Sequence, residues 1–422
     1  MNASESLVDG LKNVALFFSN LEEPVRIGKR QVSELVHILS GVKDFRCQGK
    51  TVYRLENLLA ICLLMAIRGE LRSFHYVSEY IRIMEDEFIS LGLVEKGQIP
   101  SHDTFRRVFG HLDANALRDA FLDRIREFLR RLVRQDPSSR RKKQILSGDG
   151  KTFNGSGRGD AKNLNVFNIY NASNSICLSS VPLTDKESEI PEFQRALARY
   201  DLSNHVVTAD ALHCQRKTSE VILRRRGSYV FTVKGNQPAL HEEIVARFNQ
   251  TARFGRRTVL QHNQCDYEFI TLPSGYVGCD WPGQKTYVRM VSHKRRNQKD
   301  YNPTFQYFIT SEADPQLIAE AIDNRWQIEG GLHLFKDEVL GEDECTFMDK
   351  NAVKVMATIN NVVYSLYRIA SAVLGHKSMT ETKIRFKNDP VALVSTILPL
   401  LEKKNLTALI RENMRGRKPE AK

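Results

Sequence analysis

The sequence has few cysteines and no long apolar run, and each absence excludes a class of protein. Its seven cysteines are scattered, and no two of them form a Cys-x-x-Cys pair. This spacing argues against a structural zinc site and fits a reducing compartment. The longest apolar run, at 58–67, is far shorter than the roughly 20 residues of a membrane helix. No basic stretch followed by an apolar core opens the chain, so we expect a cytoplasmic protein without a signal peptide.

A phosphate-binding loop is also missing, although one stretch resembles the end of one. The segment "QILSGDGKTF" at 144–153 contains Gly150, Lys151 and Thr152, which match the last three positions of G-x-x-x-x-G-K-[ST]. That pattern requires a glycine five positions before Gly150, where this chain has Ile145. The stretch therefore does not predict a nucleotide hydrolase, and Asp149 becomes the residue to explain.

Positive charge, in contrast, is abundant. The formal net charge is +12, which favours a polyanionic partner such as nucleic acid; a basic protein without one is the alternative. Between positions 124 and 143 the chain has nine basic and two acidic residues, which favours phosphate contact over a solvated helix face. The candidates at the end of this run are Arg140, Arg141, Lys142 and Lys143.

Hydrophobic periodicity divides the chain into helical and α/β parts. Apolar residues recur at helical spacing in the first third, and short apolar strands then alternate with helices. A β-rich segment and a further helical region follow. The predicted divisions are an arm at 1–30, an all-helical domain at 31–135, a basic linker at 136–143, an α/β core at 144–254 and 312–375, a β-rich insertion at 255–311, and a helical, basic tail at 376–422.

Several boundaries can be predicted within these parts. Ser101 is a plausible N-cap for the helix that follows it. One strand is expected to end at Asp149 and another at Asp210, and a hairpin is expected to turn at Asn174. A single helix is expected to run from Pro315 through "PQLIAEAIDNRWQIEGGLHLFKDEV".

The two aspartates predict a site, because sites in open α/β sheets gather at strand ends. Asp149 and Asp210, together with a carboxylate from a later helix, would form an oxygen cage suited to Mg²⁺ or Mn²⁺. Two ions about 3.5–4 Å apart can activate an attacking oxygen and stabilise a leaving one in phosphodiester chemistry. The alternative for each aspartate alone is a turn or helix cap.

Glu329 is the candidate for the third carboxylate. On a continuous helix, Arg325 and Lys336 fall within roughly 40° of it, and such cations can grip phosphate. A surface salt-bridge ladder is the alternative. Glu320 and Glu338 would point to the opposite face, about 180° away.

The combination of these stretches resembles the H-repeat-associated group of bacterial insertion-sequence DDE transposases. The resemblance covers roughly 40–370. It depends on "GDGKTFNGS", "DKESEIPEF", "VVTADALHCQ", "SYVFTVKGNQPALHEEI", "NRWQIEGGLHLFKDEVLGEDEC" and, in the first third, "LENLLAICLLMAIRGELRSFHYVSEYI" and "GQIPSHDTFRRVFGHLD".

The resemblance implies a ribonuclease-H-like α/β catalytic core with a β-rich insertion, preceded by a helical domain. It implies that Asp149, Asp210 and Glu329 are catalytic and hold two Mg²⁺ or Mn²⁺ ions. The implied partners are double-stranded DNA, as element ends and target, and a second copy of the chain in a homodimer, without a membrane, in the bacterial cytoplasm and nucleoid. In the superfamily pattern Y-x-x-R-x-x-x-E-x-x-x-x-x-x-K the tyrosine position holds Ile322, and Gly330 replaces a frequent asparagine.

Further residues near the strand ends are candidates for DNA or phosphate contact, each with a structural alternative such as a solvated loop, a helix cap or packing. Trp281 could stack on a base, although packing in a turn is favoured. The other candidates are Lys151, Asn154, Arg158, His213, Lys234 and Asn236.

The sequence thus predicts a transposase that cuts element ends and joins strands. Two alternatives remain open: a domesticated ribonuclease-H-like nuclease that cuts without joining, and an inactive DNA-binding protein. The presence of Asp149, Asp210 and Glu329 argues against the inactive protein.

Overall fold

A computed structural model gives the architecture of most of the chain. It describes residues 29–47, 49–135, 143–157, 163–173, 175–183, 188–262, 265–273, 280–293 and 304–401. Among these residues, no helix is both long enough and apolar enough to cross a membrane.

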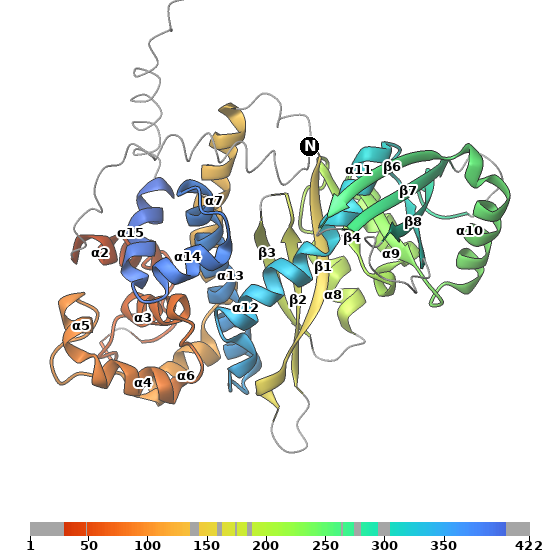
Figure 1. The fold of residues 1–422 in the computed structure, drawn as a ribbon. Helices are drawn as coiled ribbons and strands as arrows, with labels where there is room; N and C mark the ends of the chain where they lie inside the picture. The colour runs from red at the N-terminus through yellow and green to blue at the C-terminus, as the bar shows by residue number, and fades with distance from the viewer. Residues whose placement is uncertain are drawn as a thin grey trace, which may run out of the picture.

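The centre of the molecule is one mixed sheet, which contains nine strands in the described part of the chain (Figure 1). Their order is β3-β2-β1-β4-β5-β9-β8-β7-β6. The strands are β1 (Gln144–Phe153), β2 (Leu164–Asn171), β3 (Ile176–Leu183), β4 (His205–Ala209), β5 (Ser228–Val233), β6 (Arg256–His262), β7 (Cys265–Pro273), β8 (Thr286–His293) and β9 (Phe305–Thr310).

The first five strands combine an antiparallel hairpin with parallel crossovers. β1, β2 and β3 are antiparallel neighbours, so the hairpin predicted around Asn174 is confirmed, although Asn174 itself lies outside the described residues. β4 pairs with β1 and β5 pairs with β4, both in parallel. The β-rich segment does not form a separate sheet, because β9 pairs antiparallel with β5 and continues the same sheet.

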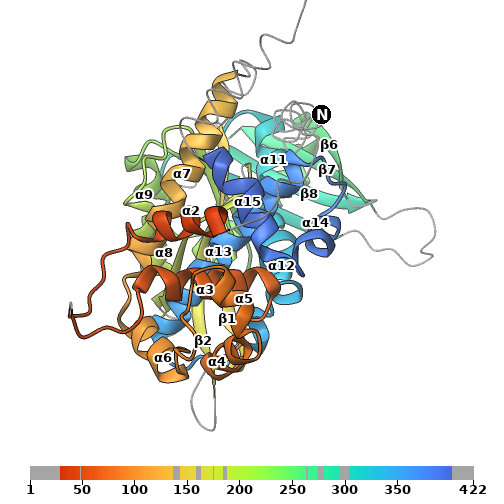
Figure 2. The same ribbon diagram turned by 90° about the vertical axis from the view of Figure 1, so that its left-hand side faces the viewer.

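Helices from both ends of the chain form one helical lobe beside the sheet (Figure 2). α13 packs against α3, α6 and α7, and α15 packs against α2 and α3. In the first third the helices are α2 (Lys29–Leu39), α3 (Leu55–Arg68), α4 (Phe74–Ile83), α5 (Glu85–Ser90), α6 (His102–His111) and α7 (Ala114–Gln135). The later helices are α8 (Glu189–Leu197), α9 (Arg216–Arg224), α10 (Pro238–Thr251), α11 (Pro315–Arg325), α12 (Leu334–Glu338), α13 (Lys350–Val373), α14 (Met379–Phe386) and α15 (Pro390–Leu401).

Local sequence explains several of these boundaries. Ser101 caps α6 as predicted, because its side chain accepts a hydrogen bond from the Thr104 amide. α3 is buried on nearly all sides, as its continuous apolar sequence predicts. It ends at Gly69, whose positive φ of 75° suits glycine. A side chain at Gly69 would also collide with the backbone of Val339, so this glycine lets α3 dock against the segment after α12.

The two faces of the central strands carry different helices. Side chains added at Gly148 or Gly150 would meet Phe193 or Glu189, so these positions of β1 face α8. Alternate strand residues point to opposite faces, and Asp149 accordingly faces the segment between α11 and α12.

Candidate active site

The strand register brings Asp149 and Asp210 together. The parallel pairing of β1 with β4 ends at Gly148 opposite Ala209, and the two aspartates are the next residues on each chain segment. The prediction that a strand ends at Asp210 is confirmed. The prediction that one ends at Asp149 is wrong, because β1 continues to Phe153 through its pairing with β2.

Asp210 both caps a helix and faces the site. Its Oδ1 accepts a hydrogen bond of 3.0 Å from the Leu212 amide, at the start of the short 3-10 helix Ala211–His213. The side chain remains half exposed. The Asn236 amide donates to the Ala211 carbonyl at 2.6 Å, which holds the turn after β5 beside this aspartate. Lys234 lies exposed in that same turn.

Glu329 lies in a π-helical turn and not on a continuous α-helix. α11 ends at Arg325, the π turn spans Ile328–His333, and α12 follows. The predicted single helix is therefore wrong. Gly330 and Gly331 occupy the turn, and glycine weakens the regular α-helical hydrogen bonding enough to allow the wider turn.

The π turn separates the two cations that were expected to flank Glu329. Arg325 lies before the turn, and its Nη1 is 3.6 Å from Glu329 Oε1. Lys336 lies after it, and the extra residue of a π turn rotates later side chains by about 100°. Lys336 is consequently 0% exposed, whereas the side chain of Glu329 is 55% exposed. The expectation that both cations share one face with Glu329 is wrong for Lys336.

His333 connects the π turn to β1. Its Nδ1 lies 3.6 Å from Asp149 Oδ2, and its Nε2 lies 3.1 Å from Asn168 Nδ2. Asn168 Oδ1 accepts from the Ser180 hydroxyl at 2.6 Å, so the amide nitrogen of Asn168 is the atom that faces the histidine. Nε2 therefore accepts, and the ring proton sits on Nδ1, directed toward Asp149. This contact places the turn that carries Glu329 beside Asp149.

The electrostatics identify a shared negative site. Burial raises the pKa of Asp149, and the charges of Glu329 and Asp210 raise it further, to about 7. Burial also lowers the pKa of His333 to about 3, with Lys336 and Lys151 acting in the same direction. The histidine is thus neutral and does not compensate the carboxylates.

Glu189 and His213 form a buried pair next to this cluster. His213 Nε2 lies 3.0 Å from Glu189 Oε1 and 3.9 Å from Asp210 Oδ1. Its ring also packs against Phe167 and Phe193. His213 is 1% exposed, so it is positioned to orient neighbouring carboxylates and not to bind DNA from solution.

Sequence reasoning missed both His333 and Glu189. Glu189 lies in a short acidic run in which no residue stands out by spacing. His333 follows Glu329 by four residues, which was the available signal, because such spacing places two side chains on neighbouring turns.

Two predicted phosphate contacts are instead part of a buried ion network. Lys151 forms an ion pair with Asp337 and lies 3.6 Å from both Glu342 and Asp343. Lys336 Nζ lies 3.1 Å from Glu342 Oε1, an ion-pair distance, although the geometry is not that of a hydrogen bond. Both lysines are buried and neutralised by the protein, so neither is available to phosphate in this structure.

The remaining predicted contacts are dispersed. Lys143 Nζ lies 2.6 Å from Glu312 Oε2, so this linker residue is already neutralised. Asn154 donates to Asp343 at 3.1 Å. Trp281 packs as favoured, and its Nε1 donates to Ser219 at 2.9 Å. The others lie outside the described residues: Arg140, Arg141, Lys142 and Arg158.

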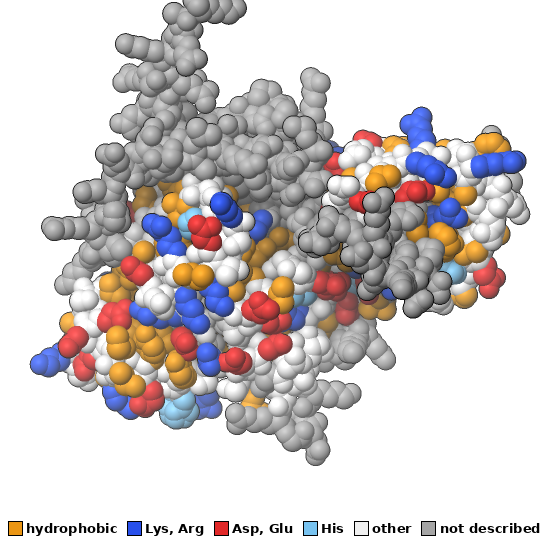
Figure 3. All heavy atoms as spheres, viewed as in Figure 1, with side chains coloured by type: hydrophobic (Ala, Val, Ile, Leu, Met, Phe, Trp, Pro, Cys, Tyr) orange, Lys and Arg blue, Asp and Glu red, His pale blue; other side chains and the backbone are white. Residues whose placement is uncertain are grey.

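The carboxylates form an open cluster. In the described part of the chain, no three His, Cys, Asp or Glu side chains converge closely enough to enclose one metal ion as they stand. Figure 3 shows acidic side chains gathered in the middle of the face that carries α12, between the helical lobe and the sheet.

Comparisons with known proteins identify the family. A family model described as "Transposase DDE domain" matches residues 131–366, which is more than half of the chain, and one described as "DDE_Tnp_1-associated" matches 36–124. The chain belongs to the transposase DDE domain family. It is a DNA transposase, as the motifs predict.

Relatives of this DDE transposase occur in Escherichia coli. The "H repeat-associated putative transposase YhhI" of strain K12 is 24% identical over 358 residues, covering 80% of this chain and 90% of that protein. The "Putative transposase YncI" of strain O157:H7 is 25% identical over 385 residues, covering 84% and 92%. These names confirm the resemblance to the H-repeat-associated group. A solved piggyBac transposase synaptic complex with hairpin DNA aligns over 98% of this chain and 83% of that one. The TM-score of 0.40 and the identity of 12% are too low to establish a common fold.

Proposed function

We propose that this transposase cleaves and joins DNA strands at a site formed by Asp149, Asp210 and Glu329. The main support is that Asp149 and Asp210 lie side by side where the parallel pairing of β1 with β4 ends, and that the charge of Glu329 also acts on Asp149. Asp149 and Asp210 follow neighbouring parallel strands, and His333 holds the turn with Glu329 against Asp149. Burial raises the pKa of Asp149, and the charges of Glu329 and Asp210 raise it further.

We also propose that the core is ribonuclease-H-like. The order β3-β2-β1-β4-β5, with an antiparallel hairpin followed by parallel strands, supports this assignment. The catalytic core would comprise 144–254 and 312–375, and the helical domain and basic linker would hold DNA. Two copies of the chain would act together on paired element ends.

The residues at the site fit Mg²⁺ or Mn²⁺ in their chemistry. Carboxylate oxygens are the ligands such ions prefer, and burial, followed by the charges of Glu329 and Asp210, raises the pKa of Asp149. Asp149, Asp210 and Glu329 would hold the ions. When bound, two ions supply activation of the attacking oxygen and stabilisation of the leaving oxygen.

The protein's own groups prepare this reaction. His333 Nδ1 lies 3.6 Å from Asp149 Oδ2 and limits the position of that carboxylate, and the Leu212 amide donates to Asp210 Oδ1. Arg325 lies 3.6 Å from Glu329 and is a cation that could contact a phosphate at this site. Asp149 must be ionised to bind a cation, so its raised pKa predicts activity that falls as the pH decreases below about 7.

The test is strand cleavage of DNA that carries the sequences flanking the gene. Asp149→Asn and Asp210→Asn should abolish cleavage and leave DNA binding largely intact, because affinity depends mainly on phosphate contacts elsewhere. Chelation of divalent ions should have the same effect. A variant that still nicks DNA in Mg²⁺ would remove that residue from the catalytic set.

A nuclease that cuts without joining is the second candidate, because the same carboxylates would serve both reactions. The two are separated by products: a transposase attaches the freed 3′ hydroxyl to target DNA, and a nuclease leaves only cut ends.

A further inference from the structure

A second charged region lies along the outer edge of the sheet, at β3. A groove with a volume of about 570 Å³ runs between α7, α8, α13 and this edge strand. Ser180 in its floor is paired with Asn168, which is paired in turn with Asp149. Two strand spacings separate the groove floor from Asp149, a distance of about 10 Å.

Among the described residues, five cations line the groove, and three of them form ion pairs with acidic side chains. Arg118 lies 2.8 Å from Asp119 and Arg126 lies 3.6 Å from Asp123. Arg195 pairs with Glu192 one turn away. The other two cations are Arg199 and Lys354.

Arg199 and Lys354 are the unbalanced charges of the groove. Neither forms an ion pair with a carboxylate in the described part of the chain. Arg199 is exposed and Lys354 is half-buried on α13. Burial lowers the pKa of Lys354; the charge of Asp113 opposes this effect, while Arg118 and Arg199 add to it. Like charges held together in this way are stabilised by an anion between them.

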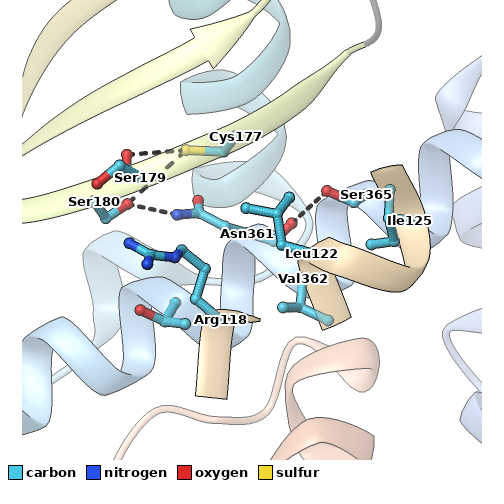
Figure 4. Close-up of a pocket in the computed structure, with 10 residues that line it drawn as sticks. Arg118, Leu122, Ile125, Cys177, Ser179, Ser180, Asn361, Val362 and Ser365 are labelled. Carbon is cyan, nitrogen blue, oxygen red and sulfur yellow. Dashed lines mark hydrogen bonds between the residues drawn. The ribbon is translucent and has the colours of Figure 1, made fainter. Parts of the chain in front are cut away.

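The groove also has the surroundings that a phosphate chain requires. Figure 4 shows the Arg118 side chain extending from α7 toward Ser179 and Ser180 of β3. Arginine forks are common contacts of phosphate oxygens, whereas Ser179 and Ser180 are buried and the Ser180 hydroxyl already donates to Asn168. Arg118 and Arg126 are eight residues apart on α7, which corresponds to about 12 Å along the helix. A row of that length matches several phosphates of one strand better than it matches a single small anion.

We propose that this groove is a second DNA-binding site, which contacts the sugar-phosphate backbone of the duplex that flanks the cleavage site. The inference rests on the proposed function for its ligand, since DNA is the polyanion that the enzyme handles. The binding would be independent of sequence, because cations contact the phosphates and not the base edges.

The experiment measures duplex affinity as a function of salt, with the full chain and the double variant Arg199→Gln/Lys354→Gln. If both cations contact phosphate, the slope of log affinity against log salt should decrease by up to about 1.8. Affinity should fall similarly for all sequences, and cleavage at saturating DNA should remain within about twofold, because the groove does not supply reacting groups. Lys350→Gln is the matched control, since Lys350 lies one turn before Lys354 on α13 and does not line the groove.

Three outcomes would overturn the proposal. The slope of the double variant could be unchanged, or Lys350→Gln could reduce it equally, which would indicate only general surface charge. Inorganic phosphate could bind the wild type and not the double variant while DNA affinity stays the same, which would indicate a small-anion site. Because the assay measures binding, it remains informative even if Asp149→Asn retains cleavage and the catalytic assignment fails.

Discussion

Two clusters of charge lie close together in this protein and are organised in opposite ways. At the candidate active site, Asp149, Asp210 and Glu329 concentrate negative charge, with Arg325 as the nearby cation. In a second cluster, Lys151 and Lys336 are each held by carboxylates of the protein, from Asp337, Glu342 and Asp343.

The difference indicates what each cluster does. In the second cluster both lysines are paired within the protein, so they need no ligand, and removing one of them leaves buried carboxylate charge uncompensated. At the candidate active site, repulsion among the carboxylates lowers the stability of the folded protein. A bound cation would relieve this repulsion. The network joins β1 to the segment that follows Glu329, so it serves as the rigid support for the open cluster.

The largest expected effect is on catalysis, at the open cluster. Glu329→Gln should reduce metal-dependent cleavage by on the order of 10³-fold or more, as is typical for a residue of a catalytic unit. Glu338→Gln is the matched control, because Glu338 is exposed on α12, beyond the π turn. Cleavage rates in Mg²⁺ measure both. Loss of activity in Glu338→Gln with retention in Glu329→Gln would reverse the assignment.

The next largest effect is expected on the free energy of unfolding, at the ion network of Lys151 and Lys336. Lys336→Met removes one partner of a buried pair and should lower the free energy of unfolding by about 3–5 kcal/mol. Asp149→Asn should leave it unchanged or increase it, because a buried, repelled charge is removed. Urea denaturation of both variants tests the contrast. Equal destabilisation would mean that the two clusters do not differ as described. Lys350→Met, at an exposed position, should change stability by less than about 0.5 kcal/mol.

A smaller effect is expected at His333, which lies between Asp149 and Asn168. His333→Ala should raise the Mg²⁺ concentration needed for half-maximal cleavage by about 10–100-fold, the usual range for groups that orient metal ligands. His333→Asn should retain more activity than His333→Gln, because an asparagine amide can replace Nδ1–H, which faces Asp149. The reverse order of rescue would show that the ring has the other tautomer.

The smallest effect concerns an ion pair near the surface. Burial alone would raise the pKa of Glu312, but the hydrogen bond from Lys143 and nearby backbone amides outweigh it, so the pKa lies below its ordinary 4.5. A lowered carboxylate pKa stabilises the fold above that ordinary value, and the stabilisation is lost as the pH falls through the folded-state pKa. Lys143→Gln should therefore lower stability at pH 7 by less than about 1 kcal/mol, and by less still near pH 3. Urea denaturation at both pH values measures the loss of unfolding free energy. An equal loss at the two pH values would contradict the prediction.

The sequence predicted strands β1 and β4, and the end of β4 before Asp210, but not the continuation of β1 past Asp149. Asp149 and Asp210 stand out because apolar strands precede them, and the strand period does not depend on distant contacts. Arg325 was placed correctly beside Glu329 because only α-helical residues and the start of the turn separate them.

The errors arose where local rules depend on the rest of the fold. Lys336 was placed on the wrong face because the predicted angles assumed a continuous α-helix across Gly330 and Gly331. The acidic partners of Lys151 are Asp337, Glu342 and Asp343, almost two hundred positions later in the chain. No local pattern in the sequence encodes such contacts.

The pairing of β9 with β5 has a consequence for how this enzyme could have been assembled or shortened. β5 is buried along its whole length, and β9 covers its outer hydrogen-bonding edge. Deleting 255–311 would expose that edge as a row of unpaired amide and carbonyl groups on an apolar strand, which is a template for aggregation. The segment therefore could not be lost as a detachable module, and a shortened protein would need a replacement strand or a charged edge to remain soluble.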